Sequence, residues 1–313
     1  MIDLRKYGDQ HILKSLKEIN ENTWLIGNLI LQRFPDSSAK HATWKDEDGS
    51  SFILSVAPKP LPTASTDISS PHIRLIHEAG DASAVWSVGN NAICKARFTM
   101  VGITSESTTL RYVQEQKPSF LTPEIFYHGY DSDRNFLFLR KVPGKTLFEI
   151  WPGLNDHARQ LYVNEIVRII REMEKWKGHI GGVDGQGIVE NWICVARFNN
   201  DFSPKNLQAN CEEMGMDCSD CVFDHNDLAP TNILVEGGPE VVRVGVVDFE
   251  LAGFFPKSWI RTKFKVSWAF DLDEKTNSDP KLFRTMMEKT LQTYGYDDLS
   301  GIWRKRLDQA NQS

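Results

Sequence analysis

The sequence predicts an α+β protein in which a small antiparallel sheet comes before a larger, mainly helical region. Two observations support this order. Between residues 72 and 142, short apolar runs alternate with glycine-containing and polar turns, which is typical of antiparallel strands. After Pro143-Gly144, apolar residues recur at three- and four-residue steps over 155–177, which indicates an amphipathic helix. A chain of 313 residues has room for about two domains or one two-lobed protein.

A separate N-terminal segment, 1–71, comes before this pattern. Its residues 9–33 carry isoleucine and leucine at helical spacing, so we expect a helix there. Residues 41–56 predict a hairpin around Asp48-Gly49, and the proline-rich stretch 57–71 predicts a linker. The expected organisation is therefore an extension and linker over 1–71, a sheet region over 72–142 and a helical region over 143–313.

Within the sheet region we expect three strands, one helix that begins after Thr104, and two further strands. These elements are predicted at 72–78, 84–88, 92–98, 105–116, 124–130 and 136–142. In the helical region, the glycine-rich residues 178–190 predict a loop. The elements expected around this loop are helices at 155–177, 203–216 and from Pro280 onward, and strands at 221–224, 233–235 and 241–247.

Composition and charge exclude several classes of protein. The net charge of −6 argues against a general nucleic-acid binder, which normally has a basic face. No apolar run approaches the roughly 20 residues that span a bilayer, so we expect no membrane partner. The N-terminus carries charges where a secretory signal would be apolar. We therefore expect a cytoplasmic protein.

The chain has five cysteines, an odd number that favours free thiols in a reducing compartment. Cys218-Ser-Asp-Cys221 has a spacing typical of zinc sites, and Cys211 lies upstream of it. A structural zinc site needs four ligands, and His225 is the one nearby histidine. We therefore favour thiols over a zinc site.

One segment carries a recognisable arrangement of polar residues. Asp227 lies five residues before Asn232, between two apolar runs, and Asp248 ends a later apolar run. Phosphoryl transfer from ATP needs a carboxylate that accepts the proton of the attacking hydroxyl, together with oxygen ligands for Mg²⁺. Asp227 suits the first role, and Asn232 and Asp248 suit the second. Asp and Asn are also common in turns, but the full pattern with His225 favours the catalytic interpretation.

These residues also resemble the motifs of a known family. The segments His225-Asn-Asp227-Leu-Ala-Pro-Thr-Asn232-Ile-Leu-Val and Val-Asp248-Phe-Glu250-Leu-Ala-Gly look like the two signatures of the aminoglycoside phosphotransferase and choline kinase family. The aromatic residues, proline and tryptophan that follow (Phe254, Phe255, Pro256 and Trp259) are similar to its fungal branch. The resemblance covers roughly residues 72–270.

The resemblance implies a bilobal, protein-kinase-like fold and an activity. The activity is ATP-dependent transfer of the γ-phosphoryl group of MgATP to a hydroxyl of a small molecule that is aminoglycoside-, choline- or metabolite-like. His225 and Asp227 match the catalytic positions. Asn232, Asp248 and Glu250 match metal positions, although Glu250 could instead hydrogen-bond its own loop.

The resemblance also implies nucleotide-binding residues. Lys95 matches the lysine that holds the α- and β-phosphates, and Glu106, with Glu115 as the alternative, matches the glutamate that pairs with it. The backbone at Gly80 and Ser83 would approach the phosphates. The hinge, residues 138–144, would pair with the adenine edge through its backbone, with Arg140 and Val142 among the binding residues.

Two other functions stay open at this point. A protein kinase is disfavoured because Glu250 stands where that class has glycine and no Ala-Pro-Glu segment follows Asp248. A non-catalytic nucleotide-binding or scaffold protein of the same fold is suggested by Arg140 and Lys141, which replace the usual hinge residues. The tryptophans Trp192, Trp259 and Trp268 either line an acceptor pocket or belong to the core. The sequence does not identify the acceptor.

Overall fold

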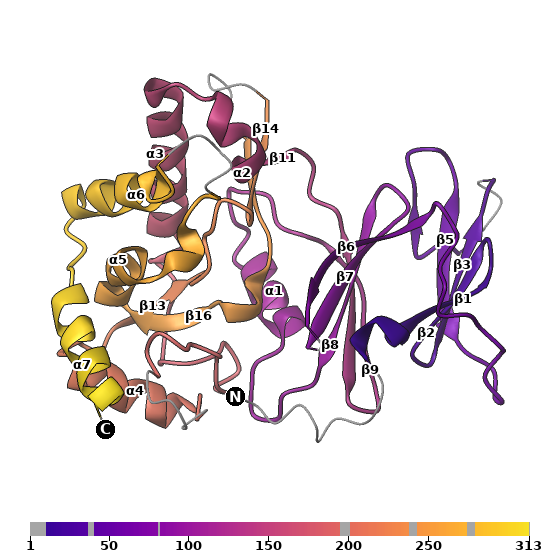
Figure 1. The fold of residues 1–313 in the computed structure, drawn as a ribbon, viewed down its shortest axis with the longest axis horizontal. Helices are drawn as coiled ribbons and strands as arrows, with labels where there is room; N and C mark the ends of the chain where they lie inside the picture. The colour runs from indigo at the N-terminus through magenta and orange to yellow at the C-terminus, as the bar shows by residue number, and fades with distance from the viewer. Residues whose placement is uncertain are drawn as a thin grey trace. The chain divides into compact units, whose positions relative to one another are not determined.

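The computed structural model describes residues 11–36, 41–80, 82–194, 201–237, 243–273 and 279–312. The chain divides into two compact units (Figure 1). The first, which we call the β unit, consists of the described residues up to Val101 together with Pro123–Lys141. The second, the helical unit, consists of Gly102–Thr122 together with the described residues from Val142. The predicted α+β organisation, with an antiparallel sheet first and helices later, is confirmed.

The β unit contains two antiparallel five-stranded sheets. The first has the order β1-β2-β3-β5-β4, with strands at Leu16–Asn20, Thr23–Ile26, Leu29–Phe34, Ser51–Val56 and Trp44–Lys45. The second has the order β6-β7-β8-β10-β9, with strands at Ile73–Ala79, Ser83–Val88, Ala92–Phe98, Arg134–Arg140 and Ile125–Asp131. One hydrophobic core joins them, because Trp24 and Phe52 from the first sheet cluster with Trp86 and Phe136 from the second.

The predicted helix over 9–33 is wrong. In the described part of that range, a short 3-10 turn at Ile12–Ser15 is followed by strands β1, β2 and β3; residues 9 and 10 lie outside the described chain. Ile26 pairs directly with Leu29, so Gly27 and Asn28 form a two-residue hairpin turn. The spacing of the apolar residues fits a helix as well as strands, and this turn decides between them. Apolar residues described between 11 and 71, Trp24 and Phe52 among them, therefore belong to the core of the β unit.

The other strand predictions in this unit are confirmed. The hairpin expected at 41–56 consists of β4 and β5, and the five strands expected between 72 and 142 form the second sheet. Residues 57–71 contain no strand or helix apart from an isolated bridge between Ser65 and Glu18. The helix expected at 105–116 is α1 (Glu106–Glu115), and its N-cap is Ser105 rather than Thr104. The hydroxyl of Thr104 instead donates to Asp184, 2.5 Å away.

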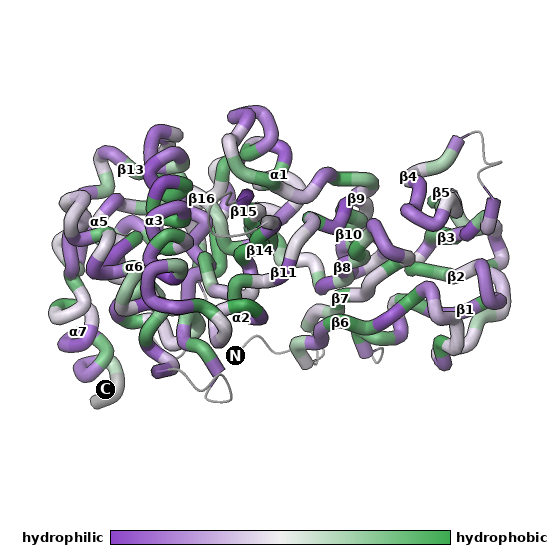
Figure 2. Tube along the Cα trace, turned by 90° about the horizontal axis from the view of Figure 1, so that it is seen from above, coloured by the Kyte–Doolittle hydropathy of each residue, from purple (hydrophilic) through white to green (hydrophobic). Residues whose placement is uncertain are grey.

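The helical unit includes α1, whose Tyr112 ring packs edge-on against Trp176 and Phe254. Its longest described helix, α3 (Asp156–Met173), is capped by Asn155 and buries Ile166, Ile169 and other residues along one face. The polar and apolar faces of α3 appear as alternating colours in Figure 2. The other α-helices described in this unit are α2 (Leu147–Ile150), α4 (Pro204–Glu213), α5 (Lys257–Val266), α6 (Leu282–Thr293) and α7 (Ser300–Gln312).

Two short antiparallel sheets in this unit flank the loops at residues 225–232 and 247–252. Their orders are β11-β14-β15 and β12-β13-β16. The strands are β11 (Lys145–Thr146), β12 (Lys177–Gly178), β13 (Cys221–Asp224), β14 (Ile233–Glu236), β15 (Arg243–Val246) and β16 (Gly253–Pro256). Residues 241 and 242 of the strand predicted at 241–247 lie outside the described residues. No helix in the described chain is long and apolar enough to cross a membrane.

Candidate active site

The loop between β13 and β14, residues 225–232, is closed by its own side chains. The side-chain amide of Asn232 donates to the backbone carbonyl of Asp227 at 2.9 Å and to its carboxylate at 2.9 Å. The Asp227 carboxyl is therefore held in one orientation by the residue five positions later. This contact turns the amide nitrogen of Asn232 toward Asp227 and its oxygen away from that carboxylate.

His225 links this loop to the strand that precedes Asp248. Its ring is fully buried, and Nε2 lies 3.0 Å from the carbonyl oxygen of Val247. Its Nδ1 lies 3.2 Å from the backbone N–H of Asp227. Because Nδ1 accepts this bond, the ring proton resides on Nε2 and is donated to Val247. Both ring nitrogens therefore fix the backbone on either side of the site.

The second loop places three carboxylates together. Asp248 has a left-handed backbone (φ 70°), a conformation that costs a non-glycine residue about 1–2 kcal/mol and is often found at functional sites. It precedes the 3-10 helix η4 (Phe249–Leu251), which carries Glu250. Carboxylate oxygens of Asp248, Glu250 and the buried Glu106 all lie within 4.8 Å of one another.

This carboxylate cluster fits a hard divalent cation. Mg²⁺ binds oxygen at about 2.1 Å, so ligands on opposite sides of the ion lie about 4.2 Å apart. The oxygen atoms of Glu106, Asp248 and Glu250 lie within 4.8 Å of one another, which is close to this spacing. Three carboxylates this close also repel one another in the absence of a cation or bound protons. The donor set and its spacing therefore suit a magnesium site.

Asn226 connects the loop to the core behind it. Its backbone is also left-handed (φ 62°), and its side chain is 2% exposed. The amide nitrogen donates to Glu190 at 2.6 Å and to the carbonyl of Leu251 at 3.2 Å. The amide oxygen accepts from the indole of Trp259 at 3.0 Å and from the ammonium of Lys263 at 2.9 Å. Every hydrogen-bonding group of this side chain has a partner.

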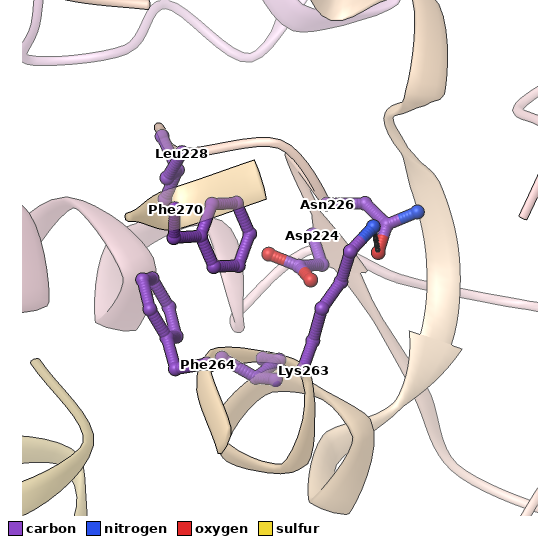
Figure 3. Close-up of a pocket in the computed structure, with 7 residues that line it drawn as sticks. Asp224, Asn226, Leu228, Lys263, Phe264 and Phe270 are labelled. Atoms are coloured by element: carbon purple, nitrogen blue, oxygen red, sulfur yellow. Dashed lines mark hydrogen bonds between the residues drawn. The ribbon is translucent and has the colours of Figure 1, made fainter. Parts of the chain in front are cut away.

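Lys263 and Glu190 form a buried ion pair at this junction. Their side chains are 5% and 1% exposed, and the ammonium lies 2.5 Å from the carboxylate. Figure 3 shows Lys263 reaching from α5 toward Asn226 and Asp224. The adjoining pocket, lined on its other side by Phe264 and Phe270, has room for about one water molecule. It is too small to hold an acceptor substrate.

Two aspartates near this ion pair have raised pKa values. Burial raises the pKa of Asp224 to about 6, and the positive charge of Lys263 opposes that change. Burial also raises the pKa of Asp227 to about 6, with Lys263 again opposing and the charges of Asp248 and Glu250 adding to the rise. The carboxyl of Asp227 is therefore electrostatically coupled to the carboxylate cluster.

The predicted nucleotide-binding residues lie mostly in the β unit. Lys95 sits in β8, where it pairs with Leu137 of β10 and Val85 of β7. Gly80 follows β6 with φ 54°, and Ser83 begins β7. Glu106 and Val142 belong to the helical unit instead. The predicted contact between Lys95 and Glu106 stays a prediction.

Arg140 ends β10 and makes contacts that the sequence pattern does not indicate. Its guanidinium donates to Glu124 at 2.7 Å and lies 4.9 Å from the ring centre of Phe126. Its backbone N–H donates to the carbonyl of Glu124 at 2.8 Å. The neighbouring Lys141 donates its backbone N–H to Asn91. Val142 is buried.

Sequence reasoning missed Glu190, Asn226 and Lys263 as site residues. Lys263 lies four residues after Trp259 on α5, so both side chains share one helix face, and this spacing could have indicated it. Glu190 has no comparable local signal. Of the tryptophans considered for an acceptor pocket, Trp259 is fully buried against Asn226. The ring centres of Trp192 and Trp268 lie 6.2 Å apart in an edge-to-face arrangement, and Trp268 is 72% exposed.

Comparison with known proteins bears on the fold. No protein-family model matches the sequence, and no curated protein matches it significantly. Among solved structures, the chain is similar to the aminoglycoside phosphotransferase APH(3'')-Id from Streptomyces rimosus. The two share 14% sequence identity at a TM-score of 0.50, over 76% of this chain and 92% of that one. The chain has the aminoglycoside phosphotransferase fold.

Two further structures of this fold are also similar to the chain. One is APH(2'')-IIa in a ternary complex with streptomycin and ATP, with 15% identity over 77% of this chain and 82% of that one and a TM-score of 0.47. The other is a thermostable mutant of APH(4)-Ia in a complex with AMP-PNP and hygromycin B. It has 14% identity over 77% of this chain and 93% of that one, with a TM-score of 0.46.

Proposed function

We propose that this protein is an ATP-dependent phosphotransferase that transfers the γ-phosphoryl group of MgATP to a hydroxyl group of a small molecule. The observation that carries this proposal is the pairing of two arrangements in the helical unit. Asp227 is clamped by Asn232, and beside it lie the carboxylates of Glu106, Asp248 and Glu250. This is the set that phosphoryl transfer requires, on a fold that is known for this chemistry.

Asp227 accepts the proton of the attacking hydroxyl in this proposal. A carboxylate with a pKa near 6 is ionised at neutral pH and is a stronger base than an ordinary aspartate. Asn232 fixes its carboxyl, and His225 fixes its backbone. We predicted His225 as a catalytic residue; because both of its ring nitrogens bond within the protein, we now assign it a positioning role.

Asn232, Asp248 and Glu250 would hold Mg²⁺, and the position of Glu106 in the cluster adds a fourth ligand to this set. A bound magnesium ion supplies positive charge that neutralises the phosphates. Lys95 and the backbone at Gly80 and Ser83 bind the phosphates in this proposal. The backbone from Arg140 to Val142 binds the adenine. These nucleotide contacts rest on the motif resemblance.

The test separates binding from turnover with Asp227→Asn. We expect this variant to bind MgATP within about threefold of the wild type, because Asp227 does not contact the nucleotide in this proposal. We expect ADP release in the presence of amino-sugar and small-alcohol acceptors to fall about 10²–10⁴-fold, the usual loss on removal of a general base. Calorimetric titration with and without Mg²⁺ and a coupled ADP assay measure the two quantities.

Asp220→Asn is the matched control, because Asp220 is an exposed aspartate of the same unit, paired with Lys177. This variant should match the wild type in both measurements. Loss of MgATP binding in Asp227→Asn would contradict the division of roles. MgATP binding by the wild type with no ADP release from any acceptor would favour a non-catalytic nucleotide-binding protein.

A further inference from the structure

The first sheet of the β unit contributes one carboxylate to the second sheet. Asp46 follows β4 and is 8% exposed. Its Oδ2 accepts a hydrogen bond from the backbone N–H of Asn90 at 2.7 Å, and its Oδ1 accepts one from the backbone N–H of Asn91 at 2.8 Å. Both donors belong to the turn at residues 89–91, which we call the β7–β8 turn. Hydrogen bonds to a carboxylate are short and strong, so Asp46 fixes this turn.

The β7–β8 turn fits closely against the first sheet. Gly89 has a left-handed backbone with φ 58°, and a Cβ added there would overlap the Asp46 carboxylate. The side-chain amide of Asn91 also donates to the carbonyl of Lys45 at 3.3 Å. Glycine therefore suits position 89 for its backbone conformation and because any side chain would push the turn away from Asp46.

The backbone of the hinge is attached to the same turn. The carbonyl of Asn91 accepts a hydrogen bond from the backbone N–H of Lys141 at 2.7 Å. This bond extends the antiparallel ladder in which Ala92 of β8 pairs with Arg140 of β10. Because the N–H of Lys141 points to Asn91, the position of the β7–β8 turn sets the direction of the hinge backbone at this residue.

A second set of contacts joins the first sheet to the hinge through aromatic rings. Trp44 of β4 stacks on both Phe52 and Phe126, with ring centres 4.9 Å and 5.3 Å away. Phe126 belongs to β9, and the guanidinium of Arg140 lies 4.9 Å from its ring centre. Two neighbouring hinge residues are therefore linked to the first sheet, one through the hydrogen-bonded turn and the other through stacked rings.

We propose that Asp46 is a positioning residue for adenine binding: it fixes the β7–β8 turn and, through Asn91, the hinge backbone at Lys141. The inference rests on the proposed function, in which the hinge binds the adenine of ATP. Asp46 acts through the turn and does not touch the nucleotide. The first sheet then contributes to nucleotide affinity as well as to the core of the β unit.

The residues proposed to bind the phosphates, Gly80 and Ser83, lie at the other end of the same strands. Ser83 begins β7 and pairs with Arg97, whereas Val88 ends β7 and pairs with Ala92, next to the β7–β8 turn. The six residues of β7 span roughly 16 Å at about 3.3 Å per residue. Release of the turn should therefore weaken contacts to the adenine more than contacts to the phosphates.

The experiment compares two ligands of the full-length protein in the presence of Mg²⁺: ATP, and inorganic tripolyphosphate, which has the phosphates without the adenosine. Displacement of a fluorescent ATP analogue measures both dissociation constants. In Asp46→Asn, an amide NH₂ group replaces one acceptor oxygen and cannot accept a backbone N–H. We expect the Kd for ATP to rise about tenfold and the Kd for tripolyphosphate to stay within about twofold of the wild type.

Asn91→Ala is a second variant, which removes only the side-chain bond to Lys45 and decides the question if Asp46→Asn fails to fold. It should raise the Kd for ATP about threefold and leave that for tripolyphosphate unchanged. Asp48→Asn is the matched control, because Asp48 lies two residues from Asp46 and its exposed carboxylate pairs with Arg33 at 2.9 Å. This control should match the wild type for both ligands.

A wild-type Kd for ATP in both Asp46→Asn and Asn91→Ala would overturn this inference and leave the proposed function standing. Equal losses for ATP and tripolyphosphate would also overturn it, because they would indicate general damage to the β unit. The same selective loss in Asp48→Asn would overturn it as well. If the wild-type protein bound neither ligand, the proposed function would fail and the inference with it.

Discussion

Asn226 uses its whole side chain to hold a backbone conformation that most residues avoid. Asparagine tolerates the left-handed region better than other non-glycine residues, so its φ of 62° costs little here. A glycine would adopt the same conformation without linking the loop to Glu190, Trp259 and Lys263. The sequence pattern indicates the loop but not these links, because they join residues up to 37 positions apart.

Lys263→Met tests this junction. The substitution leaves Glu190 buried without its cation, and breaking a buried ion pair in this way costs about 3–5 kcal/mol. We expect the free energy of unfolding, measured in urea, to fall by this amount. Lys257→Met is the control, because Lys257 lies on the same helix and its ammonium is paired with Glu174 at the surface. This substitution should lower the free energy of unfolding by less than about 1 kcal/mol.

The double variant Lys263→Met/Glu190→Gln removes both charges and should recover part of the lost stability. If Lys263→Met and Lys257→Met prove equally stable, the buried pair does not contribute as we argue.

Asp224→Asn tests the pH dependence that follows from burial. The pKa of Asp224 is about 6 in the folded protein and 3.8 in its ordinary state, so the folded protein binds more protons between these pH values. The free energy of unfolding therefore falls as pH rises from about 4 to 6. An Asn cannot ionise, so Asp224→Asn should gain about 2 kcal/mol relative to the wild type between pH 4.5 and 7.

Urea unfolding at the two pH values measures this gain. A stability difference between Asp224→Asn and the wild type that is equal at pH 4.5 and at pH 7 would show that Asp224 does not titrate as burial predicts.

At the scale of elements, strands that are bounded by clear turn residues can be predicted from the sequence, and strands without such boundaries cannot. The strands β6–β10 are flanked by clear glycine and polar turns, and they were predicted. The strands β1–β3 were missed because Leu16, Leu25 and Leu29 also fit a helical spacing. The two residues Gly27-Asn28 are typical of a tight hairpin turn. They indicate a hairpin only when the residues on both sides are also predicted to be strands.

The same distinction applies to the site. The loop at 225–232 was predictable because its residues are close in sequence and chemically specific. The position of Glu106 beside Asp248 was not, because it depends on how α1 packs in the helical unit through Tyr112. No pattern of local spacing carries that information.

Gly27→Ala tests the turn between β2 and β3. Gly27 has φ 55°, and an added Cβ would lie 2.6 Å from the ring of Phe136. Backbone strain and this overlap together should lower the free energy of unfolding by about 2–4 kcal/mol. Gly49→Ala is the matched control, because Gly49 has φ 83° but no atom within 4 Å of its added Cβ.

Backbone strain alone should lower the free energy of unfolding of Gly49→Ala by about 1 kcal/mol. Thermal unfolding compares the two variants. Equal losses would mean that contact with Phe136 does not constrain this turn.

At the scale of the whole molecule, the described residues between 11 and 71 are not an appendage to the sheet that follows them. Phe52 is fully buried, stacks on Trp44 with ring centres 4.9 Å apart, and belongs to the same core as Trp86 and Phe136 of the second sheet. Because the two sheets of the β unit share this core, they should lose protection together when it is weakened.

Phe52→Ala makes this shared core testable. Removing a buried phenylalanine costs about 3–5 kcal/mol, so amide hydrogen exchange should accelerate in β7, β8 and β10 as well as in β3 and β5. Val56→Ala, at a 79% exposed position of the same strand, should leave exchange in both sheets unchanged. Faster exchange confined to the first sheet would mean that the two sheets unfold independently, and that residues 11–71 act as a separate module.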